Sequence, residues 1–170
     1  MKKYLFLAGL LLVSAVYVNA QRYAVIDSKY ILEKLPEYKE SQQRLDQYSA
    51  QWQQEIETKQ TALDKMYKDF DAEQVMLSDE LKKKREDELY NKEKELRDLQ
   101  KKRFGFEGDL FKKRQEMIKP IQDKVYTAIQ NLAIEKSYDF ILDKSEGITV
   151  IFADPKLDRS EDVLRKLGVK

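Results

Sequence analysis

The sequence of 170 residues contains no cysteine and no histidine. These absences exclude disulfide frameworks, thiolate nucleophiles, most zinc sites and imidazole-based acid–base catalysis. Glycine and proline are scarce, with five and three residues, which argues against a loop-rich β-sandwich or barrel as the main architecture. Charged residues make up 37%, but the formal net charge is only +1, so nothing favours nucleic acid. The sequence predicts a mainly α protein that is not an enzyme and needs no cofactor.

The first 20 residues are organised like an export signal. Lys2 and Lys3 precede an apolar stretch from Tyr4 to Val18, and Ala20 ends a small-residue cleavage site. The apolar stretch is shorter than the roughly 20 residues that cross a bilayer as a helix. We therefore expect a signal peptide at residues 1–20, cleaved after Ala20. No cysteine follows it, so a lipid-anchored lipoprotein is not expected.

The section from Glu37 to Lys119 contains no proline and has apolar residues at heptad spacing. The expected seam comprises Tyr38, Leu45, Trp52, Ile56, Leu63, Met66, Phe70 and Leu77 in the first half, and Leu89, Leu96, Leu99, Phe106, Leu110 and Met117 in the second. Between the halves, Ser78 and two following acids form a helix N-terminal signal. The pattern predicts an antiparallel helical hairpin over residues 37–119, about 60 Å long at 1.5 Å per residue.

The two ends of the chain are expected to form a small mixed body from residues 21–36 and 120–170. Three strands are expected at Tyr23–Asp27, Asp139–Leu142 and Ile148–Phe152. A short helix capped by Ser28 and a final helix capped by Asp158 or Ser160 are also expected. After Pro120, a helix has one apolar face of Ile121, Val125, Ile129 and Leu132. This core is too small for comfortable independent stability, so oligomerisation is expected. The residues assigned to the body and to oligomerisation are Val25, Ile26, Ile141, Leu142, Val150, Ile151, Val163 and Leu167.

Several apolar residues of the hairpin lie outside its seam. In the returning half, Tyr90, Phe104, Phe111 and Ile118 share one heptad position, about 130° around the helix from the seam centre. We expect Phe111 and Ile118 to pack on the body. The residues expected to bind a partner are Tyr67, Met76, Tyr90 and Phe104, because exposed aromatic and methionine side chains suit varied partners.

Two glycines interrupt the returning half of the hairpin. Gly105 and Gly108 each disfavour helix by about 1 kcal/mol relative to alanine. They are expected to form a hinge. Close helix packing is the alternative explanation.

The charges of the hairpin are mixed. Residues 37–119 contain 19 basic and 20 acidic side chains, with local basic clusters at 82–85, 101–103 and 112–114. These clusters leave contact with an anionic lipid headgroup or an acidic client open. Acidic clusters such as Glu86-Asp87-Glu88 are expected to be a solvated face, and no metal site is expected because the calcium-loop pattern is absent.

In order and spacing, these segments resemble the Skp/OmpH family of periplasmic chaperones. The resemblance rests on the export signal, the strand from Tyr23, the charged hairpin, and the segments 119–125, 138–143 and 157–164. It implies a periplasmic homotrimer in which strands of three chains form a β-barrel body and three helical tentacles enclose a cavity. It also implies that unfolded outer-membrane proteins enter the cavity without ATP and are shielded from aggregation before membrane insertion.

This chain departs from the best-known family members, which are strongly basic. Without the two lysines of the signal peptide it has 30 basic and 31 acidic residues. Lipopolysaccharide binding and a purely charge-driven grip are therefore not expected, and apolar contacts are expected to hold the client. A different interpretation of the same hairpin is a periplasmic spacer or adaptor that docks on one fixed partner.

Overall fold

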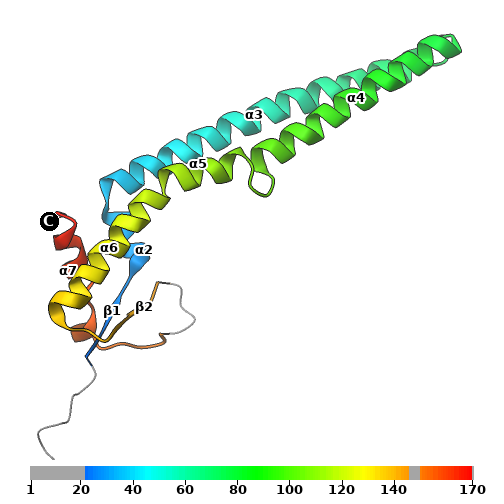
Figure 1. Cartoon of the computed structure of the whole chain (residues 1–170). Helices are drawn as coiled ribbons and strands as arrows, with labels where there is room; N and C mark the ends of the chain where they lie inside the picture. Colours follow the sequence, from blue (N-terminus) through cyan, green and yellow to red (C-terminus); the bar gives the residue numbers. More distant parts are fainter. Residues whose placement is uncertain (1–21, 146–149, 170) are drawn as a thin grey trace, which may run out of the picture. The chain divides into compact units, whose positions relative to one another are not determined.

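The computed structural model describes residues 22–145 and 150–169 and shows a mainly helical protein with a small two-stranded sheet (Figure 1). The elements are β1 (Tyr23–Ile26), α2 (Ser28–Lys34), α3 (Pro36–Glu73), α4 (Asp79–Phe104), α5 (Asp109–Met117), α6 (Lys119–Lys136), β2 (Phe140–Asp143), a 3-10 turn η2 (Pro155–Leu157) and α7 (Ser160–Lys166). The predicted signal peptide lies outside the described residues. Within them, no helix is both long and apolar enough to cross a membrane.

The chain divides into two compact units. Residues 1–31 and 127–170 belong to unit 1, and residues 32–126 belong to unit 2.

Unit 2 is built on the long helices α3 and α4, which pair along each other in opposite directions. Pro36 occupies the first turn of α3, where its fixed φ suits a helix start and its missing N–H leaves no bond unmade. Ser78 caps α4 as the sequence predicts, because its Oγ accepts a hydrogen bond from the Leu81 N–H at 3.4 Å. The chain therefore reverses between Glu73 and Asp79.

The returning side of unit 2 is not one continuous helix. α4 ends at Phe104, four residues follow, and α5 begins at Asp109. The expectation that Phe106 lies in the seam is wrong, because its side chain is 97% exposed. The heptad count assumes an unbroken helix, and its phase is lost once the helix ends at Gly105.

Unit 1 contains a parallel pair, β1 and β2, in which Tyr23 lies opposite Phe140 and Ile26 opposite Asp143. The rings of Tyr23 and Phe140 stack with centroids 5.6 Å apart. On the other side of β1, Val25 forms a bridge with Asp158, and its carbonyl accepts the Arg159 N–H at 2.8 Å. β1 is therefore the central segment of unit 1.

The core of unit 1 lies on β1 and its covering helices. Val25, Ile26, Ile31, Leu132 and Val163 are each no more than 4% exposed. Their burial removes apolar surface from water at roughly 25 cal/mol per Å². On α7, Val163 and Leu164 are buried, and Leu167, directly after the helix, is half-buried.

Two expectations for unit 1 need correction. The third strand is not formed at Val150–Phe152, where the chain has no strand hydrogen bonds and Ile151 is 98% exposed; Ile148 and Thr149 lie outside the described residues. Ser28 does not cap α2 either. Asp27 does, because its Oδ1 accepts the Tyr30 N–H at 2.8 Å. Asp27 stands one residue before the helix, and from there its carboxylate reaches the free N–H groups of the first turn.

Candidate functional site

The seam of unit 2 uses the apolar residues that the heptad pattern assigns to it. Leu63 on α3 and Leu89 and Leu96 on α4 form a buried cluster, and Ile56, Met66 and Phe70 pack against it. Leu45 is also buried, at 2% exposed. Because these side chains hold the helices together, the surface available for a partner consists of the apolar side chains that remain outside the seam.

Four side chains predicted to bind a partner lie on or beside this helix pair. Met76 is 78% exposed and Tyr90 is 61% exposed. Tyr67 is 39% exposed and donates its hydroxyl to Glu93 Oε2 at 3.3 Å. Desolvation and this carboxylate both raise the pKa of Tyr67. Phe104 is 37% exposed, and its ring and that of Trp52 form a T-shaped pair with centroids 6.4 Å apart. Two of the four are therefore open to solvent, and two are partly covered.

The turn between α3 and α4 exposes apolar residues that the heptad analysis leaves out. Val75, in the turn itself, is 86% exposed, and Leu81, in the first turn of α4, is 52% exposed. Both lie close in sequence to Met76, and the run of apolar residues Val75-Met76-Leu77 between two helices is the sequence signal that marks this end of the pair. A small crevice of about 90 Å³ lies near this end of the pair. It is lined by Met66, Phe70 and Leu89 together with Asp69, Glu73 and Arg85.

A cluster around Arg103 joins α3 to the break between α4 and α5. The Arg103 guanidinium contacts Glu55 Oε2 at 3.0 Å and Asp109 Oδ2 at 2.8 Å. It also lies over the Trp52 ring, 4.9 Å from the centroid, in a cation–π contact. Trp52 in turn stacks on Tyr48 with centroids 5.6 Å apart. Arg103 therefore fixes both ends of the break to each other and to α3.

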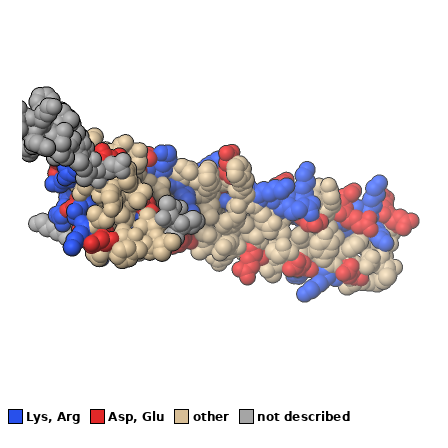
Figure 2. All heavy atoms as spheres, turned by 90° about the horizontal axis from the view of Figure 1, so that it is seen from below, with Lys and Arg blue, Asp and Glu red and all other residues tan. Residues whose placement is uncertain are grey.

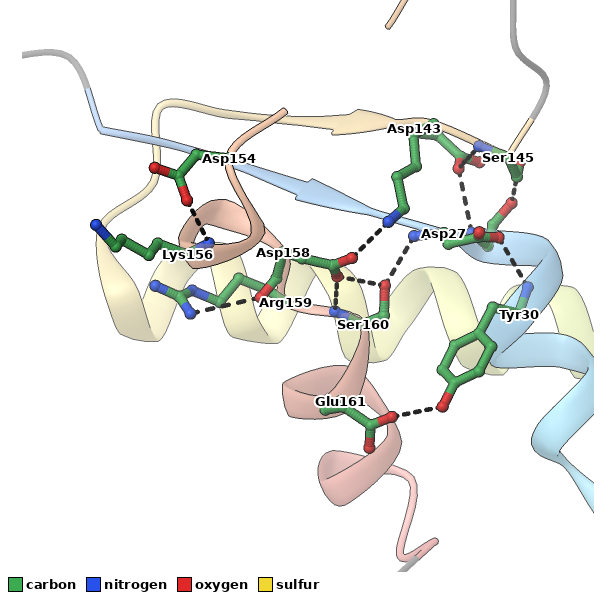
Figure 3. A network of polar contacts seen from close by, with 12 residues as sticks. Asp27, Tyr30, Asp143, Ser145, Asp154, Lys156, Asp158, Arg159, Ser160 and Glu161 are labelled. Atoms are coloured by element: carbon green, nitrogen blue, oxygen red, sulfur yellow. Dashed lines mark hydrogen bonds and ion pairs between the residues drawn. The ribbon is translucent and has the colours of Figure 1, made fainter. Parts of the chain in front are cut away.

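In unit 1 a polar network ties together three distant segments of the chain (Figure 3). Asp158 accepts hydrogen bonds from the N–H and Oγ of Ser160 at 2.8 and 2.7 Å, and its other oxygen contacts Lys144 Nζ at 2.6 Å. The Asp27 N–H donates to Ser160 Oγ at 2.8 Å. Asp143 Oδ1 accepts the N–H groups of Ser28 and Ser145 at 3.1 and 2.9 Å. Both oxygens of Asp158 and Oδ1 of Asp143 accept contacts from donors within unit 1, so the network holds the fold of this unit.

A comparison with known protein families identifies the family of this chain. The family described as outer membrane protein (OmpH-like) matches residues 22–167, which covers all of β1, the helix pair and α7. The chain belongs to the OmpH-like family.

A solved structure supports the same fold for this OmpH-like chain. It is a crystal structure from Caulobacter crescentus CB15 of a protein described as a candidate outer membrane chaperone (OmpH-like). The TM-score is 0.68 at 19% sequence identity, and the match covers 87% of this chain and 84% of that chain. At this identity the similarity establishes the fold. No curated protein matches the sequence.

The surface of the OmpH-like helix pair carries both signs of charge. In the face drawn in Figure 2, basic and acidic atoms are interspersed along the paired helices. The pairs that the structure describes include Arg97 with Glu93 and Arg85 with Glu73, the latter at 3.9 Å across the two helices. Exposed pairs of this kind contribute about 0–1 kcal/mol each. They keep the helices soluble without creating a field of one sign.

The residues predicted for oligomerisation fall into two classes in this OmpH-like fold. Val25, Ile26 and Val163 are buried within the single chain. Ile141, Val150 and Leu167 are half-buried, whereas Leu142 is 36% exposed and Ile151 is 98% exposed. Phe152, which the sequence analysis did not single out for this role, is 84% exposed. Only the second class has apolar surface left for a second chain. Among residues 22–145 and 150–169, no three carboxylates lie close enough together to hold a metal ion.

We expect Asp158→Asn to lower the free energy of unfolding by roughly 1.5–3 kcal/mol at neutral pH, the size of hydrogen bonds to a charged group. Partial burial raises the pKa of Asp158, but bonds from Lys144 and Ser160 outweigh it and leave the pKa below its usual value. Because the folded pKa is the lower one, the stabilisation is complete above the unfolded pKa of about 3.9 and is lost as the pH falls through the folded pKa.

Urea unfolding followed by circular dichroism from pH 7 to acid measures this effect. The variant should lose stability less steeply than the wild type below about pH 4. Asp154→Asn is the matched control, since asparagine can still accept the Lys156 N–H that Asp154 accepts at 2.9 Å. Equal acid sensitivity in wild type and Asp158→Asn would contradict the assignment.

Proposed function

We propose that this protein is an ATP-independent periplasmic chaperone that binds unfolded outer-membrane β-barrel proteins and prevents their aggregation before membrane insertion. The observation that carries the proposal is the exposure of Met76 and Tyr90 on a helix pair whose seam is already filled. Unfolded β-barrel chains expose apolar side chains that aggregate, and exposed apolar groups on a carrier compete for them. Membership of the OmpH-like family supports the same role.

Contacts between a client and exposed methionine and tyrosine side chains suit a carrier that uses no energy source. Methionine and tyrosine side chains adapt to varied partners, and each contact contributes little. A client held by many weak contacts stays mobile and is released when a tighter acceptor is available.

We propose that three chains assemble through unit 1, with a shared β-barrel at the centre and the helix pairs as tentacles. The support is apolar surface that one chain leaves open. β2 pairs with β1 on one side, and the described part of the chain places no strand on its other side. Leu142, Ile151 and Phe152 are exposed on or after this strand. Open strand edges and large apolar side chains are both stabilised by pairing with another chain.

We propose export to the periplasm with cleavage after Ala20. The support is the organisation of residues 1–20. Residues 37–119 carry 19 basic and 20 acidic side chains, so apolar contacts and not lipopolysaccharide or an anionic membrane are the proposed main attraction.

The experiment is an aggregation assay on a urea-denatured outer-membrane β-barrel protein. Wild-type mature chain should suppress light scattering at stoichiometric ratios without ATP. Replacing Tyr67, Met76 and Tyr90 together by serine should weaken client retention by about tenfold, equivalent to about 1.4 kcal/mol spread over three contacts. Native mass spectrometry reports whether the assembly is a trimer and whether the variant preserves it.

The matched control replaces Gln53, Thr61 and Asn91 by serine, three exposed polar residues of the same helices. It should retain the client like the wild type. If the wild type leaves aggregation unchanged, the chaperone role is wrong and a spacer that docks on one fixed partner becomes the better explanation. If the wild type suppresses aggregation and the Tyr67, Met76 and Tyr90 triple variant retains the client equally well, only the assignment of these three residues is wrong.

A further inference from the structure

The break between α4 and α5 exposes one aromatic side chain almost completely. Phe106 is 97% exposed, whereas Phe104, two residues earlier, packs the edge of its ring against Trp52. A solitary exposed phenylalanine on a surface needs no explanation by itself. At this break, however, the backbone has an unusual conformation, and several neighbouring residues are needed to stabilise it.

Two glycines make this conformation possible because they leave space for the backbone. A Cβ on Gly105 would lie 2.4 Å from the carbonyl oxygen of Lys101, and a Cβ on Gly108 would lie 2.9 Å from the oxygens of Gly105 and Lys102. Between them, Glu107 has a φ of 55°, in the left-handed region that non-glycine residues rarely adopt. The chain therefore leaves α4 in a tight turn with the Phe106 side chain in solvent.

Contacts on both sides hold the turn in place. Arg103, just before it, pairs with Asp109, just after it, at 2.8 Å and with Glu55 on α3 at 3.0 Å. The Trp52 ring covers the guanidinium. An unfavourable backbone conformation persists only where its surroundings enforce it, and such positions are often functional. The contacts around the turn therefore fix the position of Phe106.

The charge around the turn indicates the partner. Lys101, Lys102 and Lys112 are exposed, and none of them forms an ion pair within the described residues. Phe111, in the first turn of α5, is 46% exposed. Glu107 is an exposed acid next to Phe106 in the sequence, and the turn with its flanks combines exposed aromatic rings with lysines that form no ion pair with a described residue. An extended segment with apolar side chains flanked by acids is complementary to it.

We propose that Phe106 is an anchor that grips extended, unfolded segments in which aromatic or aliphatic side chains alternate with acidic ones. The anchor rests on the proposed chaperone function and adds a site to it. The residues that hold the turn, Arg103, Gly105, Gly108 and Asp109, position the anchor and do not touch the client.

The test measures binding of two fluorescent peptides of equal length to the full mature protein. One alternates leucine and phenylalanine with aspartate, and the other replaces each aspartate by lysine. The aspartate peptide should bind about tenfold more tightly than the lysine peptide. Phe106→Ser should weaken binding of the aspartate peptide by about tenfold, whereas Phe106→Trp should bind this peptide as tightly as the wild type. Tyr126→Ser removes an aromatic that is 62% exposed on α6 and serves as the matched control.

The outcomes distinguish failure of the Phe106 anchor from failure of the chaperone function. The same variants are tested with the urea-denatured β-barrel protein, and native mass spectrometry confirms that their assembly is unchanged. If the wild type holds that protein and Phe106→Ser holds both probes equally well, the anchor is wrong and the chaperone function stands. Equal binding of the two peptides, or an equal loss in Tyr126→Ser, also overturns the anchor. If the wild type does not hold the denatured protein, both proposals are wrong.

Discussion

Replacing Leu89 by alanine should lower the free energy of unfolding by roughly 3 kcal/mol, within the range for buried leucines. Leu89 is 5% exposed and forms the centre of the described cluster with Leu63 and Leu96. α4 is rich in charge and has only a narrow apolar stripe, so few other contacts replace the lost side chain. The cavity would also remove support for Met66 and Phe70, which pack on this cluster.

Urea unfolding followed by far-ultraviolet circular dichroism at one fixed chain concentration measures the loss. A fixed concentration matters because assembly contributes to apparent stability. Leu81→Ala is the matched control, since Leu81 lies on the same helix and is 52% exposed. Its effect should stay within about 0.5 kcal/mol. Equal effects of the two substitutions would mean that the α3–α4 seam does not hold the pair together.

The seam itself could be predicted from the sequence because its signal is local. Heptad spacing places Leu45 and Leu63 on α3 and Leu89 and Leu96 on α4 in the seam, and all four are buried. Ser78 is recognisable as a cap for the same reason, since an N-cap bonds to residues two or three positions ahead. The helix period and the cap depend only on neighbours within one or two turns, so a short stretch of sequence is enough to predict both.

The sheet could not be predicted in the same way, because strand pairing depends on distant residues. Tyr23 pairs with Phe140, and β propensity alone does not specify the partner or the direction. The run from Ile148 to Phe152 has strong β propensity, but Val150–Phe152 has no strand partner in one chain. Its exposed side chains remain consistent with the proposed assembly.

The candidate site was predictable only in part. Met76 and Tyr90 lie outside the heptad seam, and both are exposed. Phe106 was missed because its heptad position holds only while the helix continues. The signal that could have found it is the pair of glycines around Phe106-Glu107, read as the end of one helix and the start of another. The heptad pattern has to be counted separately on each side of a helix break.

Gly105→Ala should destabilise the protein by about 2 kcal/mol, as overpacking does. The added Cβ would meet the Lys101 carbonyl oxygen at 2.4 Å, and the nearest atoms are all backbone, which cannot rotate away. The turn would have to open, and Phe106 would move from its exposed position. We therefore expect client retention to fall together with the midpoint of urea unfolding.

The sign of this change distinguishes the two explanations of the glycines. If Gly105 served only as a flexible hinge, alanine would restrict the unfolded chain and stabilise the protein by about 0.4–1 kcal/mol. If it gives the backbone room for a close approach, alanine must destabilise it. Phe106→Ser is the matched control, because it removes the exposed ring without adding an atom near Lys101. It should lose client retention while its urea midpoint stays at the wild-type value, so that loss of the turn and loss of the ring are measured separately.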